Sequence, residues 1–223
     1  MKRAGFEFIL FDMIGTTVMD NGAGDSCIMD CFVTSFHQCG IPVNREKFIP
    51  LRGRSKLEAI QELLPDSLGN SDLPERIYSV FLKLLKDSLD RFSEMPGASE
   101  LFRFLKEYPL KIGLGSGLPG GFMTDLIRHL EWDFRYFDYL GSSEEIGHGR
   151  PHPAMILDSM KKLNILDPSR VLKIGDTAVD ILEGKNAGVR TAVVLTGTQA
   201  LQDLILHGPD FIFQDITMLK NIL

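Results

Sequence analysis

Short, largely apolar runs that stop at a polar residue are the feature that most limits how this chain folds. Three such runs are residues 6–11, 110–114 and 171–174. They are followed within two residues by Asp12, Ser116 and Asp176, respectively. Continuous apolarity, rather than strict alternation, is typical of strands that are buried on both faces of a parallel sheet. Each run therefore predicts a buried strand with a chemically useful side chain at its carboxyl end.

Helical periodicity fills the segments between these strands in the second half of the chain. We predict helices at residues 99–106, 122–130, 154–163 and 179–187. Further strands are predicted at residues 139–141, 191–195 and 211–213. Strands that alternate with helices in this way form a parallel sheet with helices on both faces. The sequence therefore predicts an α/β fold built on a Rossmann-like, doubly wound parallel sheet.

The segment of residues 18–92 has a different pattern. Apolar residues recur there at spacings of three and four, which indicates helices, and we expect no strand in this segment. The predicted helices are at residues 26–39, 54–64 and 73–92. We therefore predict an inserted α-helical cap domain at residues 18–92, and a core domain made of residues 1–17 and 93–223.

The composition argues against several classes of partner. The chain has 223 residues and a net charge of -6, with lysines and arginines spread among acidic residues. Without a basic stripe, neither nucleic acid nor an anionic membrane is expected as a partner. No run reaches the roughly 18 apolar residues of a membrane span, and no secretory signal opens the chain. We expect a cytoplasmic protein, a monomer or a homodimer, with reduced core thiols at Cys27, Cys31 and Cys39.

Four short motifs carry the functional prediction. Ligands of doubly wound sheets bind outside the carboxyl ends of the strands, so Asp12, Ser116 and Asp176 are expected to meet there. These residues and Arg150 lie in the stretches DMIGTT, GSG, GDTAVD and GRPHP. Over nearly the whole chain, the ordered set resembles the motifs of the haloacid dehalogenase superfamily of phosphatases. The resemblance implies a mobile cap, a nucleophilic Asp12 that becomes an aspartyl-phosphate, and a Mg²⁺ cofactor.

The resemblance also implies which residues hold the metal ion. It places Mg²⁺ on Asp12, on the backbone carbonyl of Ile14 and on Asp176, which suits the preference of this ion for oxygen ligands. Asp180 lies one helical turn after Asp176, where it can hold waters of the metal or orient Arg150. Because the ligand at Ile14 is a backbone oxygen, its apolar side chain does not remove the site.

The substrate phosphate needs positive charge and hydrogen-bond donors. By the resemblance, Arg150 binds phosphate and carboxylate together through its guanidinium, and Ser116 donates its hydroxyl. Backbone N–H groups of the glycine-rich stretch 115–121 add donors at the start of a helix. Four more positions implied to bind substrate are Gly15, Thr16, Arg52 and Gly117. The expected partner is a small phosphorylated or phosphonate metabolite.

Ile14 stands where the common phosphatase branch has an aspartate that protonates the leaving group. The phosphonatase branch, phosphonoacetaldehyde hydrolase, also has an apolar residue there and opens with a stretch similar to DMIGTTV. It uses a cap lysine that forms an imine with the substrate, and Lys56 in RGRSKLEAI occupies the matching position. The chain departs from that branch at Ala59, where the family has a histidine, and at Leu118, where it has a tyrosine.

The charges beside Lys56 and the missing acid leave the function open at this point. Arg52 and Arg54 either lower the pKa of Lys56 or bind a more anionic substrate. One hypothesis is a phosphonatase-like hydrolase that cleaves a carbon–phosphorus bond. A second is a phosphomonoesterase of a small metabolite such as phosphoglycolate or a sugar phosphate, in which water or substrate replaces the acid. A third is a non-catalytic protein that binds a phosphate ligand.

Overall fold

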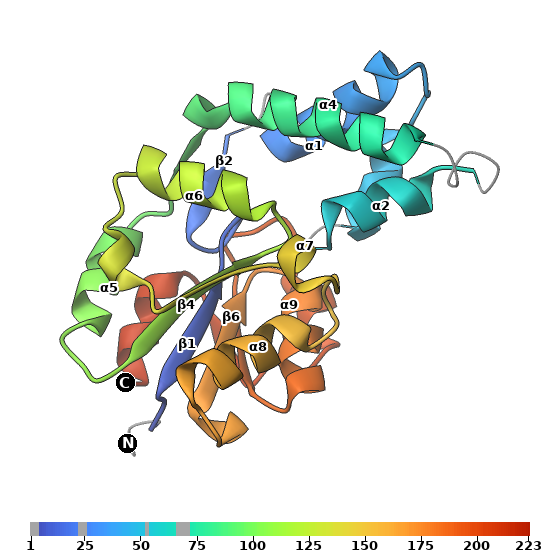
Figure 1. Ribbon diagram of the computed structural model, residues 1–223. Helices are drawn as coiled ribbons and strands as arrows, with labels where there is room; N and C mark the ends of the chain where they lie inside the picture. Colours follow the sequence, from blue (N-terminus) through green and yellow to red (C-terminus); the bar gives the residue numbers. More distant parts are fainter. Residues whose placement is uncertain (1–4, 22–25, 52–53, 66–71) are drawn as a thin grey trace.

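A computed structural model describes residues 5–21, 26–51, 54–65 and 72–223 (Figure 1). Its centre is a six-stranded sheet with the order β5-β4-β1-β6-β7-β8, in which every neighbouring pair is parallel. The strands are β1 (Phe8–Asp12), β4 (Lys111–Ser116), β5 (Tyr139–Ser142), β6 (Val171–Gly175), β7 (Arg190–Val194) and β8 (Phe211–Phe213). The predicted α/β fold with a doubly wound parallel sheet is confirmed.

The strand order reverses at β1, which has β4 on one side and β6 on the other. Asp12 pairs with Gly115, the residue before Ser116, and the preceding residue of β1 pairs with Ile174, two positions before Asp176. This register brings the carboxyl ends of the three central strands level with one another. A reversal of strand order is where ligands bind in open α/β sheets, so these ends mark the place to look for a site.

Helices cover both faces of the sheet because side chains of the central strand point alternately to each face. Ile9 and Phe11 of β1 belong to a core that includes residues of α5 and α6, whereas Phe8 and Leu10 pack with residues of α8. The helices of this part are α5 (Ala98–Leu105), α6 (Gly120–His129), α7 (Ser143–Ile146), α8 (Ala154–Leu163), α9 (Ala178–Ala187) and α10 (Leu201–Ile205). Short 3₁₀ turns are η3 (Phe134–Tyr136), η4 (Pro168–Arg170) and η5 (Ile216–Asn221).

A group of helices lies above the carboxyl ends of the strands, and we call it the inserted helices (Figure 1). Its members are α1 (Cys27–Gln38), η1 (Arg45–Leu51), α2 (Lys56–Leu63) and α4 (Leu73–Asp87). An aromatic cluster joins α1, η1 and α4, because the Phe32 ring lies 4.7 Å from that of Phe81 and 4.9 Å from that of Phe48, centroid to centroid. Cys27 and Cys31 of α1 are buried free thiols.

The expectation of no strand within residues 18–92 was wrong at both ends of that segment. Strand β2 (Val18–Asp20) pairs antiparallel with β3 (Phe92–Glu94), and the helix predicted to reach Phe92 ends at Asp87, before the turn η2 (Leu89–Arg91). Strands this short carry no readable alternation, and their partners are far apart in sequence.

The domain boundaries stay a prediction, and both fall at this strand pair. In the part of the chain that the structure describes, no helix has the length and apolarity to cross a membrane.

Candidate active site

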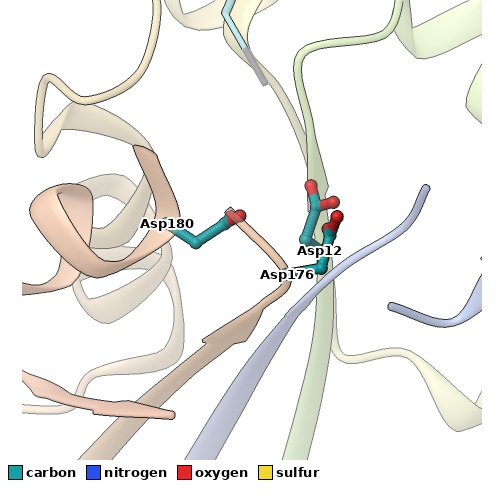
Figure 2. Close-up of side chains that lie close together, drawn as sticks. All are labelled: Asp12, Asp176 and Asp180. Carbon is teal, nitrogen blue, oxygen red and sulfur yellow. The ribbon is translucent and has the colours of Figure 1, made fainter. Parts of the chain in front are cut away.

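Three carboxylates meet at the carboxyl edge of the sheet. Asp12 ends β1, Asp176 directly follows β6, and Asp180 lies in the first turn of α9. Figure 2 shows the carboxylates of Asp12 and Asp176 side by side, with Asp180 reaching toward them from its helix. One oxygen from each of the three lies within 4.8 Å of the others, and all three residues are buried. This buried acidic group can bind a metal ion.

The electrostatics of Asp12 and Asp176 favour a cation between them. Burial raises the pKa of Asp176 well above its ordinary range, and repulsion from Asp12 and Asp180 adds to the effect. Burial also raises the pKa of Asp12, even though Arg150 pulls it down. Carboxylates crowded in this way gain most from a positive charge that all of them can share, so the donor set fits a divalent cation.

The loop after β1 is shaped around Asp176. A Cβ atom at Gly15 would lie 2.4 Å from Asp176 Oδ2, and Gly15 has a φ of 85°, so two constraints select glycine there. The Thr16 hydroxyl donates to Asp176 Oδ1 at 3.2 Å, and the Thr196 hydroxyl donates to the Gly15 carbonyl at 2.6 Å. Gly15 and Thr16, which the sequence assigns to substrate binding, thus lie against the acidic group, and Ile14 lines the cavity beside them.

Arg150 joins two of the carboxylates. Its Nη1 lies 2.6 Å from Asp12 Oδ1 and 2.8 Å from Asp180 Oδ1, and the side chain is only 2% exposed. The Asp180 carboxylate also accepts a hydrogen bond of 2.5 Å from the Thr177 hydroxyl. Burial acts to raise the pKa of Asp180, but Lys173 and Arg150 outweigh it, so this pKa lies below its ordinary value. Asp180 is therefore an anionic support for Arg150.

Lys173 and Glu183 are buried charges that the sequence interpretation missed. Lys173 Nζ lies 2.9 Å from Asp180 Oδ1 and 3.5 Å from Glu183 Oε2, and both side chains are fully buried. Burial raises the pKa of Glu183 to about 7, although Lys173 and Arg150 oppose the shift. A lysine inside the apolar strand VLKIG, with an acid three residues after Asp180 on the next helix, was the signal available in the sequence.

Lys56 is the first residue of α2 and lines the same cavity as Asp12 and Arg150. Burial, and next the guanidinium of Arg150, lower the pKa of Lys56 to about 8, while Asp12 and Asp20 oppose the shift. Its Nζ donates to the Arg54 carbonyl at 3.2 Å. The Arg54 guanidinium itself pairs with Glu62 at 2.6 Å. Among the described residues, the positive charge that lowers this pKa is that of Arg150 and not that of Arg54, which was one of the two alternatives left open by the sequence. Arg52 lies outside the described residues.

Ser116 and Gly117 lie where β4 leads toward α6. Because β4 and β6 flank β1, these two residues are on the other side of Asp12 from Asp176. The Ser116 hydroxyl accepts a hydrogen bond from the backbone N–H of Leu118 at 3.2 Å, and the Leu118 carbonyl accepts one from the Ser142 hydroxyl at 2.8 Å. Ser116, Gly117 and Leu118 all line the cavity. The loop is thus held in a shape that presents a hydroxyl to a ligand of the carboxylates.

The cavity has a volume of about 300 Å³ and lies between the strand ends and the inserted helices. Its floor carries Asp12, Arg150 and Asp176, and Lys56 of α2 lies on the side of the inserted helices. Its roof is formed by apolar side chains of the inserted helices, namely Ile28, Met29, Phe32, Phe48, Leu51 and Ala59. A cavity of this size with a few convergent polar groups is typical of small-molecule sites.

Two hydrogen bonds tie the inserted helices to the sheet domain beside the cavity. Glu58 Oε1 of α2 accepts from the backbone N–H of Gly149, the residue before Arg150, at 3.0 Å. The Tyr78 hydroxyl of α4 donates to Glu144 Oε2 of α7 at 2.5 Å. The first contact links the helix that carries Lys56 to the loop that carries Arg150.

Comparisons with known proteins give matches over most of the chain. The family model of haloacid dehalogenase-like hydrolases matches residues 9–194. Phosphonoacetaldehyde hydrolase of Bordetella pertussis is 29% identical over 208 residues, which cover 87% of this chain and 74% of that protein.

Solved structures share the fold. A phosphonoacetaldehyde hydrolase-like protein from Oleispira antarctica matches with a TM-score of 0.84 and 21% identity, over 100% of this chain and 93% of that one. A haloacid dehalogenase-like hydrolase from Bacteroides fragilis matches with a TM-score of 0.83 and 21% identity, over 96% and 99%. At these identities the structural likeness concerns the fold alone.

Proposed function

Because this chain belongs to the haloacid dehalogenase-like hydrolases and is an enzyme of that class, we propose that it releases phosphate from a small phosphonate by cleaving a carbon–phosphorus bond. The observation that carries the proposal is the amine of Lys56, which shares one cavity with Asp12 and Arg150. With its pKa lowered to about 8, this amine is available as a nucleophile in a way that a surface lysine is not.

The fraction of neutral amine shows why the lowered pKa matters. At pH 7, a lysine with a pKa of about 8 is roughly 10% neutral, whereas an ordinary lysine is roughly 0.03% neutral. Only the neutral amine attacks a carbonyl group. Burial and the Arg150 guanidinium therefore raise the concentration of the reactive form about three-hundredfold over that of an exposed lysine.

The proposed phosphoryl transfer uses the floor of the cavity. The Asp12 carboxylate attacks phosphorus and forms an aspartyl-phosphate, Arg150 binds the phosphoryl oxygens, and the Ser116 hydroxyl donates to them. Asp12, the Ile14 carbonyl and Asp176 would hold a divalent cation, proposed as Mg²⁺, which would supply positive charge to the phosphoryl oxygens. Asp180 is assigned to orienting Arg150, because Arg150, Lys173 and Thr177 already engage its carboxylate.

The imine replaces the acid that is absent at Ile14. Lys56 attacks the carbonyl carbon of the substrate and loses water to give an iminium ion. When the carbon–phosphorus bond breaks, its electron pair moves into the iminium and forms an enamine, so no leaving-group acid is needed. Ala59 offers no titratable group one turn along α2, so we assign the proton transfers of imine formation to water.

A trapping experiment tests this proposal directly. Borohydride added to enzyme, Mg²⁺ and phosphonoacetaldehyde should leave a reduced adduct on Lys56, found by peptide mass spectrometry. Lys56→Arg keeps the charge but forms no imine, so trapping and phosphate release should both be lost. The matched control is Lys86→Arg, because Lys86 of α4 is exposed and only weakly paired with Asp125 at 4.0 Å. Trapping that persists in Lys56→Arg would refute the role of Lys56.

A phosphomonoesterase is the second candidate, because Asp12, Ser116 and Arg150 act on the phosphoryl group whether its partner atom is carbon or oxygen. The products separate the two, since an ester yields an alcohol and a phosphonate yields a carbonyl compound with a new C–H bond. We set aside a binding protein without turnover, because the chain belongs to a family of hydrolases. Whether the enzyme is a monomer or a homodimer stays a prediction.

A further inference from the structure

The two ends of the cavity suit different parts of a ligand. The end at the sheet carries Asp12, Ser116, Arg150 and Asp176, which suit a phosphonate group. The end at the inserted helices is largely apolar apart from Ser26 and Lys56, and its apolar side chains are almost completely buried: Met29 is 5% exposed, Phe32 4%, Phe48 3% and Leu51 8%. A ligand that carries an apolar group opposite its phosphonate would bury that group against the apolar wall while the charged floor binds the phosphonate.

The volume of the cavity exceeds what a two-carbon phosphonate fills. At roughly 30 Å³ for each water-sized group, about 300 Å³ holds about ten such groups. A two-carbon phosphonate has fewer non-hydrogen atoms than this, and its phosphonate and carbonyl groups would occupy the sheet end and the region of Lys56. The apolar lining at the inserted helices would then face no part of that ligand.

Ala59 lines the cavity next to Lys56. It lies three residues after Lys56 on α2, so the two side chains share one face of the helix, and both line the cavity. The small methyl of Ala59 takes up little of the cavity beside Lys56, and Phe32 and Phe48 line the same cavity. A substituent on the carbonyl carbon would enter this part of the cavity.

From this arrangement we propose that the substrate is a ketone, either a 2-oxoalkylphosphonate or a 2-aryl-2-oxoethylphosphonate, whose apolar substituent packs between Ala59 and the wall of Met29, Phe32, Phe48 and Leu51. The inference rests on the function proposed above and specifies its substrate class. A two-carbon aldehyde carries only hydrogen at the position that faces the wall.

The chemistry balances with water as the only co-reactant. Lys56 condenses with the ketone and releases water, and Asp12 takes the phosphoryl group as the carbon–phosphorus electron pair forms an enamine. The enamine carbon takes a proton, and water hydrolyses the resulting iminium to a methyl ketone and free Lys56. A further water hydrolyses the aspartyl-phosphate. In sum, one ketophosphonate and one water give one methyl ketone and one phosphate, without oxidation or reduction.

The test is a series of ketones whose apolar substituent grows, and the electrophilicity of the carbonyl stays similar among its alkyl members. We would measure phosphate release with Mg²⁺ from 2-oxopropyl-, 2-oxobutyl-, 2-oxohexyl- and phenacylphosphonate, with phosphonoacetaldehyde alongside. Each added methylene that enters the apolar end should raise kcat/KM about fourfold, until the cavity is full. The methyl ketone product should appear in equal amount to phosphate.

Two variants test the place of the substituent. Ala59→Leu fills the space beside Lys56, so the rise of kcat/KM with chain length should disappear. Phe48→Leu enlarges the apolar end and should move the optimum toward longer substituents, and melting curves of both variants verify that they are folded. A wild-type series that is flat or falls with chain length, while phosphonoacetaldehyde is cleaved, would overturn the inference and leave the proposed function standing. Cleavage of phosphate esters alone, or of nothing in the panel, would refute the proposed function itself.

Discussion

The pH dependence of carbon–phosphorus cleavage should bend near pH 8, because the amine of Lys56 must lose its proton before it attacks the substrate. Between pH 6 and pH 8 the neutral fraction of a group with a pKa of about 8 rises from roughly 1% to 50%, so kcat/KM should rise about fiftyfold. From pH 8 to pH 9 it should rise by only about twofold. A lysine with an ordinary pKa would instead give about a tenfold rise over that last interval.

The pKa of Lys56 is lowered because of the groups that surround its amine. Burial and Arg150 disfavour the charged form and lower the pKa, whereas Asp12 and Asp20 favour the charged form. Asp20→Asn removes one of the two opposing charges, so its profile should bend at a lower pH than that of the wild type. This carboxylate also accepts the backbone N–H of Cys27 at 2.5 Å at the start of α1, so a melting curve must show that the variant is folded.

The assay is phosphate release from a ketophosphonate or from phosphonoacetaldehyde, measured over a range of substrate concentrations at each pH from 6 to 9.5. Circular dichroism at each pH is the control for folding. Any phosphate-ester hydrolysis by the same enzyme gives an internal comparison, because it does not need the amine and should not show the bend. A rate that keeps rising about tenfold per unit above pH 8 would show that Lys56 titrates as an exposed lysine, and the reasoning from its burial would be wrong.

Three other perturbations test the rest of the site. Asp12→Asn removes the proposed nucleophile and should lower kcat more than about a thousandfold without unfolding the chain, and EDTA should abolish turnover reversibly; near-normal rates in either case would contradict the mechanism. Glu58→Ala breaks the hydrogen bond to the Gly149 N–H and should lower kcat/KM about tenfold, whereas Glu62→Ala on the same helix should have little effect, and equal losses would count against the contact. Lys173→Met removes a buried positive charge that faces Asp180 and Glu183 and should lower the free energy of unfolding by about 3–5 kcal/mol in urea titrations. Adding Glu183→Gln should recover part of that loss, and no recovery would mean that the pair is not the cause.

The place of Asp12, Ser116 and Asp176 followed from the sequence for a simple reason. A parallel sheet aligns the carboxyl ends of its strands, so residues just after buried apolar runs must share one edge, whatever the details of packing. The helical nature of the segment around Cys27 and Phe81 also followed from local periodicity. These inferences use only the chain near each residue and one general rule about sheets.

Other parts of the site depend on contacts between residues that are distant in the sequence. The β2–β3 pair and the hydrogen bond from Gly149 to Glu58 join segments that carry no pattern linking them. The pKa of Lys56 follows from burial and from the distance to Arg150, and neither is written in the residues around Lys56. Local sequence placed charged Arg54 beside this amine, but in the folded chain its guanidinium turns to Glu62.

What the sequence determined by itself is therefore the sheet, its reactive edge and the types of side chain present, because these follow from local apolar pattern and spacing. Only the tertiary structure decided how the charges are shared: Arg150 between Asp12 and Asp180, and Lys173 between Asp180 and Glu183. Electrostatic energies depend on distance and burial, which packing sets across the whole chain and no short stretch encodes.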